Sequence, residues 1–245
     1  MKRKDIIYGV RPIIEALETG KEMEKIMVQR GAGSEGIKHI MTLSRKRDIQ
    51  IQIVPFEKLQ KITTANHQGV IAFVSAIEYQ DIFNLVPGLF ESGETPFILV
   101  LDRITDVRNF GAICRTAECA GVHAVVIPAQ NAAQINEDAI KTSAGAISRI
   151  PICRHKDLKE VLQFLQESGI SIFGLTEKAK TVYHSPDFTV PMAVVLGNEG
   201  EGISREYFRF FADSLSIPMV GEIQSLNVSV ANGILLFEVL RQRTK

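Results

Sequence analysis

Short apolar runs without a polar position most constrain what this chain can fold into. The run FILVL, which ends immediately before Asp102, and the run MAVVL at Met192–Leu196 contain only apolar residues. A strand that is apolar on both faces is typical of a parallel sheet covered by helices on both sides. Helix-like segments separate such runs, for example Asp157–Ser168, where apolar residues recur on one helix face. This alternation predicts an α/β fold with a parallel sheet.

The first third of the chain predicts a separate, smaller α/β unit. Strand-like segments such as Gly69–Ala76 alternate there with helix-like segments such as Ile37–Arg47. Turn residues are dense in the segment that follows, which is typical of a connection between domains. We therefore expect a first domain over residues 1–76, a linker over 77–96 that can contain a short helix, and a second domain over 97–245.

Charge is distributed unevenly along the chain, although its 28 basic and 28 acidic residues cancel. Residues 1–80 contain 13 lysines and arginines against 9 acidic residues. A basic surface attracts the phosphate backbone of nucleic acids. The densest basic clusters are Lys2-Arg3-Lys4 and Arg45-Lys46-Arg47. Clusters of this kind are usually solvated faces, and an RNA-binding surface is the alternative interpretation.

Composition disfavours several classes of protein. No apolar run approaches the ~18 residues of a membrane-spanning helix, and no long apolar stretch follows the basic start as it would in a secretory signal. The cysteines, Cys114, Cys119 and Cys153, form no CxxC pair, and no histidine pair has the spacing of zinc ligands. We therefore expect a cytoplasmic protein with reduced thiols, no metal site and no membrane partner.

Three segments, Asp102–Glu118, Leu196–Gly202 and Ile217–Ala231, combine polar residues and glycines with the ends of predicted strands. Ligands of open α/β sheets bind outside the carboxyl ends of the strands, and glycine lets backbone N–H groups approach a ligand closely. Simpler interpretations are that Asn109 or Asn227 only caps a helix and that the glycines only form a turn.

The helix-like segment Val228–Leu240 is apolar on nearly every side. This pattern is typical of a helix that is fully buried or lies in a subunit interface. Asn227, Ser229 and Asn232 are polar exceptions near its start. Because buried polar groups need hydrogen-bond partners, a bound ligand or a partner subunit is expected there.

A dinucleotide oxidoreductase is one alternative, because it would share the parallel sheet. The motif GxGxxG is absent, however, and the glycines of Leu196–Gly202 come late in the chain. Glu199 and Glu201 also disfavour a phosphate and favour a ligand with cationic or hydroxyl groups. A non-catalytic RNA-binding protein is the other alternative, which would need the basic first domain but not the glycine-rich turn.

Together the three segments resemble the signature motifs of the SpoU (TrmH-like) branch of the SPOUT RNA 2′-O-ribose methyltransferases. NFGAICRTAE at Asn109–Glu118 resembles the first motif, VVLGNEGEG at Val194–Gly202 the second, and IPM with SLNVSVA within Ile217–Ala231 the third. Residues 5–76, which include GVRP at Gly9–Pro12, resemble the substrate-binding domain of the 23S rRNA guanosine methyltransferase subgroup.

The resemblance implies a fold, a cofactor and partners. The fold would be a C-terminal parallel-sheet domain with a deep trefoil knot, preceded by a small ribosomal-protein-like α/β domain. The cofactor would be S-adenosyl-L-methionine, and the substrate would be 23S rRNA or its assembly intermediate, with tRNA or another rRNA site left open. The chain would form a homodimer through its catalytic domain.

The resemblance also implies site residues. The catalytic positions would be Asn109, Arg115, Glu199 and Asn227. The cofactor contacts would be Thr176, Leu196, Gly197, Ile217, Met219, Ser225 and Leu226, and the RNA contacts would be Arg11, Arg45, Lys46 and Arg47. Family accounts make Arg115 the base, but a guanidinium stays protonated above pH ~12. We therefore expect Arg115 to hold an RNA phosphate and polarise the ribose hydroxyl, which Asn109 and Glu199 orient, and the identity of the base is left open.

Overall fold

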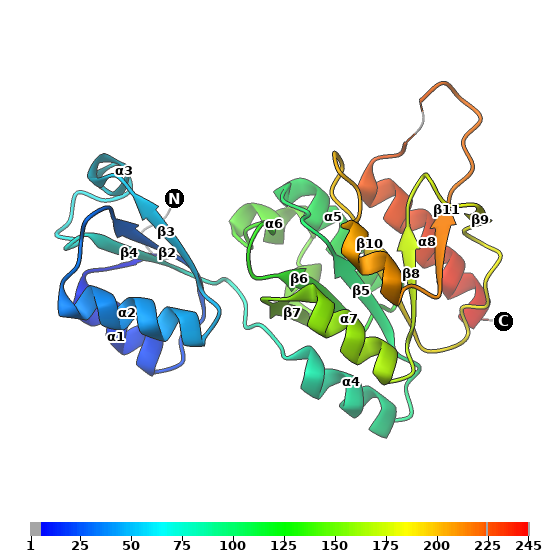
Figure 1. Cartoon of the computed structure of the whole chain (residues 1–245), viewed down its shortest axis with the longest axis horizontal. Coiled ribbons are helices and arrows are strands. Elements are labelled where there is room, and N and C mark those ends of the chain that lie inside the picture. The colour runs from blue at the N-terminus through cyan, green and yellow to red at the C-terminus, as the bar shows by residue number, and fades with distance from the viewer. Residues whose placement is uncertain (1–5, 224, 245) are drawn as a thin grey trace. The chain divides into compact units, whose positions relative to one another are not determined.

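The computed structural model describes residues 6–223 and 225–244 and divides into two compact units, Met1–Glu78 and Tyr79–Lys245 (Figure 1). The predicted basic cluster Lys2-Arg3-Lys4 lies outside the described residues. Each unit has its own sheet and its own buried hydrophobic residues.

The first unit is a mixed sheet with helices on both faces. Its strands are β1 (Ile6–Tyr8), β2 (Met23–Gln29), β3 (Gln50–Val54) and β4 (Val70–Val74), in the order β1-β4-β2-β3. Strand β4 runs antiparallel to β1 and β2, whereas β2 and β3 are parallel. Its helices are α1 (Val10–Glu18), α2 (Glu35–Lys46) and α3 (Phe56–Gln60). Buried Ile13 and Ile40 bring α1 and α2 into one core, and Leu59 of α3 belongs to a second one.

The second unit contains a parallel sheet with the order β7-β6-β5-β10-β8-β11-β9. Its strands are β5 (Phe97–Leu101), β6 (Ala124–Pro128), β7 (Ile152–His155), β8 (Ser171–Leu175), β9 (Thr181–Val182), β10 (Met192–Leu196) and β11 (Asp213–Ser216). Every neighbouring pair is parallel. All residues of β5 and β10 are buried, as the uninterrupted apolar runs predict. The predicted α/β class is therefore confirmed.

Helices cover both faces of this sheet. They are α4 (Ile82–Glu91), α5 (Val107–Cys119), α6 (Glu137–Thr142), α7 (Leu158–Glu167) and α8 (Val228–Arg243), with the 3-10 helices η1 (Ala146–Ser148) and η2 (Arg205–Phe210). Helices α4 and α7 and η2 share a core on one face, whereas α5, α6 and α8 pack together on the other face (Figure 1).

The segment 77–96, which the sequence suggested as a linker, contains α4. Ile82 and Val86 of this helix are 2% and 1% exposed, and they pack in the core of the second unit with α7. The structure therefore moves the boundary between the units to Glu78 and Tyr79. Turn residues such as Pro87 suggested a connection, but tertiary burial of the apolar positions stabilises a helix there.

Side-chain caps determine where several helices begin. The Asp106 carboxylate accepts a hydrogen bond from the Asn109 backbone N–H at 2.8 Å, so α5 begins at Val107. The interpretation of Asn109 as a cap is therefore wrong, and its side chain is available to the site. The structure confirms the alternative that Asn227 caps α8, because its Oδ1 accepts from the Ser229 N–H at 2.9 Å. The expected helix after Ser204 is the 3-10 helix η2.

Helix α8 is only partly buried in the chain. Leu235, Leu236 and Val239 are completely buried, whereas Val230 and Phe237 are each 50% exposed. Asn232 is also completely buried, and neither its amide nitrogen nor its oxygen has a hydrogen-bond partner among the described residues. In the described part of the chain, no helix combines the length and apolarity needed to cross a membrane.

Candidate active site

A pocket of about 550 Å³ lies at the carboxyl ends of β8, β10 and β11 and at the start of α8. The chain leaves β5 toward α5 and leaves the adjacent β10 toward η2, on opposite faces of the sheet. A crevice forms where neighbouring strands diverge in this way, and such crevices bind ligands in open α/β sheets. The pocket is lined by Leu175–Lys178, Leu196–Gly202, Ile217, Met219, Ser225–Val228 and Ala231.

The structure brings most of the predicted site residues to this pocket. The expected cofactor contacts Thr176, Leu196, Gly197, Ile217, Met219, Ser225 and Leu226 all line it, as do Glu199 and Asn227. Asn109 is outside the lining but is hydrogen-bonded to both Glu199 and Asn227. Arg115 is exposed on α5, and no hydrogen bond or ion pair is found for its side chain in the described part of the chain.

The glycine-rich turn after β10 folds tightly back on itself. A Cβ atom at Gly197 would lie 2.2 Å from the carbonyl carbon of Gly202 and 2.2 Å from the backbone nitrogen of Ile203. The backbones of residues 197 and 202 therefore approach more closely than any side chain would permit. The Gly202 N–H donates to the Asn198 carbonyl at 2.8 Å and closes the turn. The turn thus forms one wall of the pocket from backbone atoms.

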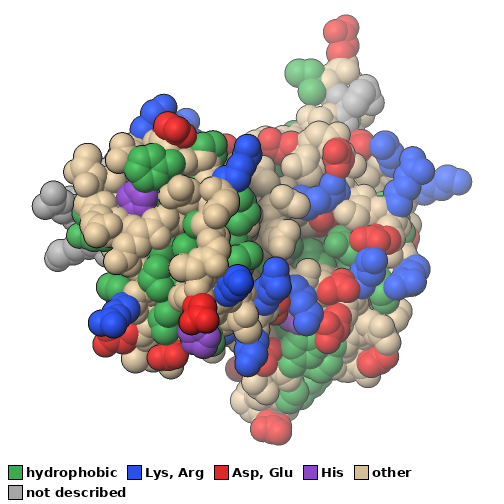
Figure 2. Space-filling view, turned by 60° about the vertical axis from the view of Figure 1, so that its left-hand side comes forward, with side chains coloured by type: hydrophobic (Ala, Val, Ile, Leu, Met, Phe, Trp, Pro, Cys, Tyr) green, Lys and Arg blue, Asp and Glu red, His purple; other side chains and the backbone are tan. Residues whose placement is uncertain are grey.

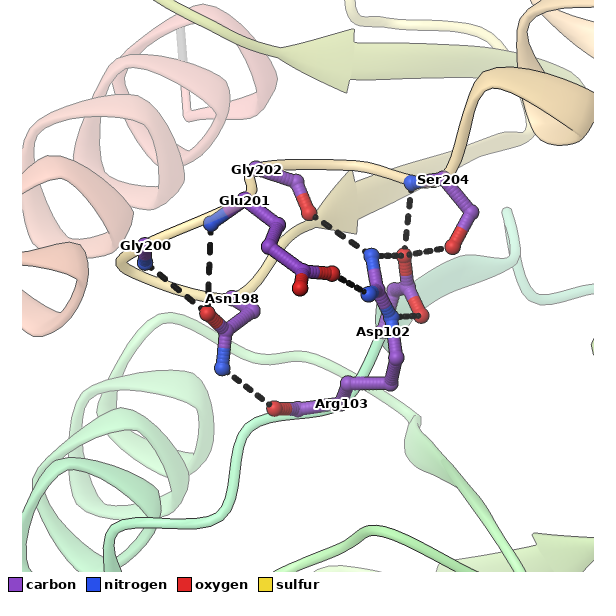
Figure 3. A network of polar contacts seen from close by, with 7 residues as sticks. All are labelled: Asp102, Arg103, Asn198, Gly200, Glu201, Gly202 and Ser204. Atoms are coloured by element: carbon purple, nitrogen blue, oxygen red, sulfur yellow. Dashed lines mark hydrogen bonds and ion pairs between the residues drawn. The ribbon is translucent and has the colours of Figure 1, made fainter.

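Asp102 and Arg103, at the end of β5, hold this turn in place (Figure 3). The Asp102 carboxylate is 1% exposed and accepts from the Ser204 backbone N–H and hydroxyl, each at 2.7 Å. Arg103 donates to both oxygens of Asp102, at 2.9 and 3.1 Å, and to the Gly202 carbonyl at 3.1 Å, and it pairs with Glu201. A buried carboxylate needs this degree of pairing, because a lone buried charge is strongly destabilising. We call Asp102, Arg103, Glu201 and Ser204 the clamp.

The backbone of Arg103 is also held by the turn. Arg103 has a φ of 58°, a left-handed backbone that costs a non-glycine residue on the order of 1–3 kcal/mol unless its surroundings hold it. Its carbonyl accepts from the Asn198 amide nitrogen at 3.0 Å, and the Asn198 oxygen accepts from the Gly200 N–H at 2.8 Å. The hydrogen bonds to Asp102, followed by the charges of Asp102 and Glu201, raise the Arg103 pKa above its ordinary value, so this guanidinium stays charged.

A second polar system joins the three predicted motifs at the mouth of the pocket. The Asn227 amide nitrogen donates to the Asn109 oxygen at 3.1 Å, and the Asn109 amide nitrogen donates to a carboxylate oxygen of Glu199. Asn227 Oδ1 accepts from both the backbone N–H and the hydroxyl of Ser229, at 2.9 and 2.6 Å. We call Ser229, Asn227, Asn109 and Glu199 the relay. It connects the starts of α5 and α8 to the glycine-rich turn.

The donor set of the pocket fits S-adenosyl-L-methionine. Leu175, Leu196 and Met219 offer apolar surface for an adenine ring, and Glu177 is an acidic group suited to ribose hydroxyls. The volume of about 550 Å³ lies in the range of small-molecule sites, about 300–1,000 Å³. Among the described residues, no group of histidine, cysteine and acidic side chains could hold a metal ion.

The predicted RNA-contacting residues all lie in the first unit, and they differ in exposure. Arg11 is exposed at the start of α1, and Arg45 and Lys46 are exposed at the end of α2. Arg47 donates to the backbone carbonyls of Leu17 and Gly20, at 2.9 and 3.0 Å, and it pairs with Glu22 at 3.1 Å. Its guanidinium therefore stabilises the end of α1. Figure 2 shows basic side chains beside acidic ones over much of the visible face, in keeping with the zero net charge.

The clamp was not predicted from the sequence. Asp102 lies at the end of a predicted strand, and a charged residue directly after an apolar run is a common pattern. Only the pairing of β5 with β10 brings Asp102 next to Ser204, 102 positions later in the chain. The sequence indicates no role for Asn198 within the glycine-rich segment, although its side chain organises that turn in the structure.

The fold and the pocket define a protein class: a parallel α/β domain with a ligand site at the carboxyl ends of its strands, preceded by a small α/β accessory domain. The chain belongs to the SpoU rRNA Methylase family, whose model matches residues 96–237. A second model, for the RNA 2′-O ribose methyltransferase substrate-binding domain, matches residues 6–80. The resemblance inferred from the motifs is therefore confirmed.

Known proteins resemble this chain over nearly its full length. It is 35% identical to the putative TrmH family tRNA/rRNA methyltransferase YacO of Bacillus subtilis, over 99% of this chain and 97% of that protein. It is 38% identical to the 23S rRNA (guanosine-2′-O-)-methyltransferase RlmB of Yersinia pestis, over 98% of both chains. The crystal structure of the SpoU methyltransferase AviRb from Streptomyces viridochromogenes in complex with AdoMet has a TM-score of 0.62 and 25% identity, covering 98% of this chain and 90% of that chain.

Proposed function

We propose that this protein transfers the methyl group of S-adenosyl-L-methionine to the ribose 2′-hydroxyl of a guanosine in 23S rRNA. The observation that carries the proposal is a pocket lined by the second and third motif segments, to which Asn109 of the first motif is joined by hydrogen bonds with Glu199 and Asn227. Relatives named as 23S rRNA guanosine-2′-O-methyltransferases match nearly the whole chain, and a structural neighbour was crystallised with AdoMet. A cytoplasmic location goes with a ribosomal RNA substrate.

The bound cofactor supplies a methyl group that is already activated as a sulfonium. The protein must then hold the ribose hydroxyl in line with that group and receive one proton. We assign the turn at Gly197 and the apolar side chains of the pocket to cofactor binding, and we assign the relay to the hydroxyl. Arg115 would hold an RNA phosphate, since a guanidinium is a strong donor that does not give up its proton.

The first unit would bind the RNA. Exposed Arg11, Arg45 and Lys46 can each neutralise a phosphate, and the match of residues 6–80 to a substrate-binding domain supports a role of this unit in RNA binding. Arg47 is assigned to the fold of the unit instead, because its donors are used within the protein.

The proposed assembly is a homodimer formed through the second unit, with the C-terminal segment threaded as a trefoil knot. Apolar side chains are exposed in this part of the chain: Val230 and Phe237 of α8 are half-exposed, and Val220 near the pocket is fully exposed. Their exposure supports an interface in which a second copy of the chain covers them. After β11 the chain passes the carboxyl ends of β8 and β10 and enters α8, which packs on α5. This path supports the proposed threading of the C-terminal segment. Sedimentation analysis is expected to give twice the mass of 27.2 kDa.

The function is tested by incubating the protein with labelled S-adenosyl-L-methionine and 23S rRNA and mapping 2′-O-methylation at each nucleotide. One guanosine is expected to be modified. In a parallel thermal-shift measurement, S-adenosyl-L-methionine at 100 times its Kd would stabilise the fold by about 2.7 kcal/mol. Modification of tRNA alone would change the substrate, and stabilisation by NAD but not by S-adenosyl-L-methionine would refute the methyltransferase.

A further inference from the structure

The relay contains a directional chain of hydrogen bonds that ends on Glu199. Asn227 caps α8, so its side-chain oxygen must face Ser229, from which it accepts at 2.9 and 2.6 Å. Its amide nitrogen is therefore turned toward Asn109 and donates to the oxygen of that residue. Asn109 is left with its own amide nitrogen facing Glu199. The helix cap thus determines the orientation of both amides.

Glu199 is held at its backbone as well as at its side chain. The residues on both sides of it are fixed by Asn198, which binds the Arg103 carbonyl at 3.0 Å and the Gly200 N–H at 2.8 Å. Asn109 occupies one carboxylate oxygen, Oε1, and no hydrogen bond or ion pair to the other oxygen is found within the described residues. The residue is exposed at the pocket, where a ribose from outside can reach it.

We propose that Glu199 is the proton acceptor of the methyl transfer, and that Asn109 and Asn227 are positioning residues that present its second carboxylate oxygen to the ribose. This inference rests on the proposed function. A carboxylate accepts protons, whereas the guanidinium of the motif arginine, Arg115, cannot do so at neutral pH. The clamp and the relay supply the fixed geometry that acid–base catalysis needs.

The step balances in atoms and charge. A lone pair of the 2′-oxygen forms the new bond to the methyl carbon, while the carbon–sulfur bond breaks and its electron pair goes to sulfur. The sulfur becomes a neutral thioether. Glu199 receives the hydroxyl proton and becomes a neutral carboxylic acid, which releases the proton to water after the product leaves. The positive charge of the sulfonium and the negative charge of the carboxylate are thus both lost in one step.

The first test replaces the acceptor. Glu199→Gln keeps the size of the side chain and removes its ability to take a proton. We expect kcat to fall by about 10²–10⁴-fold, the usual contribution of a general base, while calorimetric Kd values for S-adenosyl-L-methionine and for RNA stay within about threefold. Glu206→Gln is the matched control, because Glu206 is an exposed carboxylate paired with Lys159 at 2.9 Å outside the pocket. It is expected to behave as wild type.

The second test reverses the relay without removing the helix cap. Asn227→Asp keeps an oxygen that accepts from Ser229, and aspartate is as good a cap as asparagine. It loses the donor to Asn109, so that Asn109 turns its nitrogen toward residue 227 and its oxygen toward Glu199. We expect kcat to fall by about tenfold, the scale of one lost hydrogen bond, with an unchanged unfolding temperature and an unchanged cofactor Kd.

Three results would overturn the assignment. They are a Glu199→Gln variant with more than a tenth of the wild-type kcat, a Glu199→Gln variant whose cofactor affinity falls as much as its rate, and an Asn227→Asp variant with normal kcat. A wild-type protein that binds S-adenosyl-L-methionine but methylates no RNA would instead overturn the proposed function, and this inference with it.

Discussion

Gly197→Ala is expected to damage the pocket proposed for the cofactor through one methyl group. The added Cβ would lie 2.2 Å from the backbone of both Gly202 and Ile203. Ordinary contacts between such atoms are about 3.5–4.0 Å, so the two strands of the turn must separate by more than about 1 Å. Overpacking of this kind costs about 1–3 kcal/mol. Since about 1.4 kcal/mol is a tenfold change in affinity, S-adenosyl-L-methionine should bind roughly 5–150 times more weakly.

Gly200→Ala is the matched control in the same turn. A Cβ at Gly200 would meet only the side-chain oxygen of Asn198, at 3.4 Å, which is an ordinary contact. Isothermal titration calorimetry of both variants measures the affinity, and thermal unfolding checks that the second unit is folded. The steric argument is refuted if Gly197→Ala binds the cofactor as tightly as wild type, or if Gly200→Ala loses as much affinity as Gly197→Ala.

Two further predictions concern charged groups. Arg47→Gln should destabilise the first unit by about 1–3 kcal/mol in chemical unfolding, because the backbone carbonyls of Leu17 and Gly20 lose their hydrogen-bond donor. Lys46→Gln should leave the stability of this unit unchanged and lower the salt dependence of RNA binding by about one ion. Equal stabilities of the two variants would contradict these separate roles of Arg47 and Lys46. Hydrogen bonds from Arg241 hold the Glu238 pKa at about 2, below its ordinary 4.5. Since the folded pKa is the lower one, this stabilisation is complete above pH 4.5 and is lost as the pH falls toward 2. Glu238→Gln should therefore flatten the pH dependence of the unfolding temperature in that window, and an unchanged slope would show that the pair contributes nothing.

The sequence predicted those parts of the fold that depend on neighbouring residues along the chain, and it missed those that depend on contacts between distant segments. The apolar runs of β5 and β10 identified buried strands, because both faces of those strands are covered and the run has no polar position. The sequence did not show that most of the segment 77–96 packs as part of the second unit. The turn residues of this segment are a local signal, whereas the burial of Ile82 and Val86 against α7 depends on a partner far along the chain.

The candidate site shows the same division. The motif pattern was sufficient to name Glu199, Asn109 and Asn227 as a group, and the structure places them within hydrogen-bond contact. It could not show that Asp106 caps α5 in place of Asn109, since both are capable cap residues three positions apart. Nor could it show that Arg47 is used within the fold, because its partners Leu17 and Gly20 belong to another helix and its turn.

Hydrophobic periodicity and ordered motifs were enough to predict the parallel α/β class, the two units and the family, because both are properties of the chain along its length. How the site is held depends on the tertiary structure. Asp102 meets Ser204, and Asn109 meets Asn227, only after strand pairing and helix packing bring together segments about a hundred residues apart. Hydrogen bonds act over about 3 Å, so no pattern along the chain reveals which distant polar groups will share one.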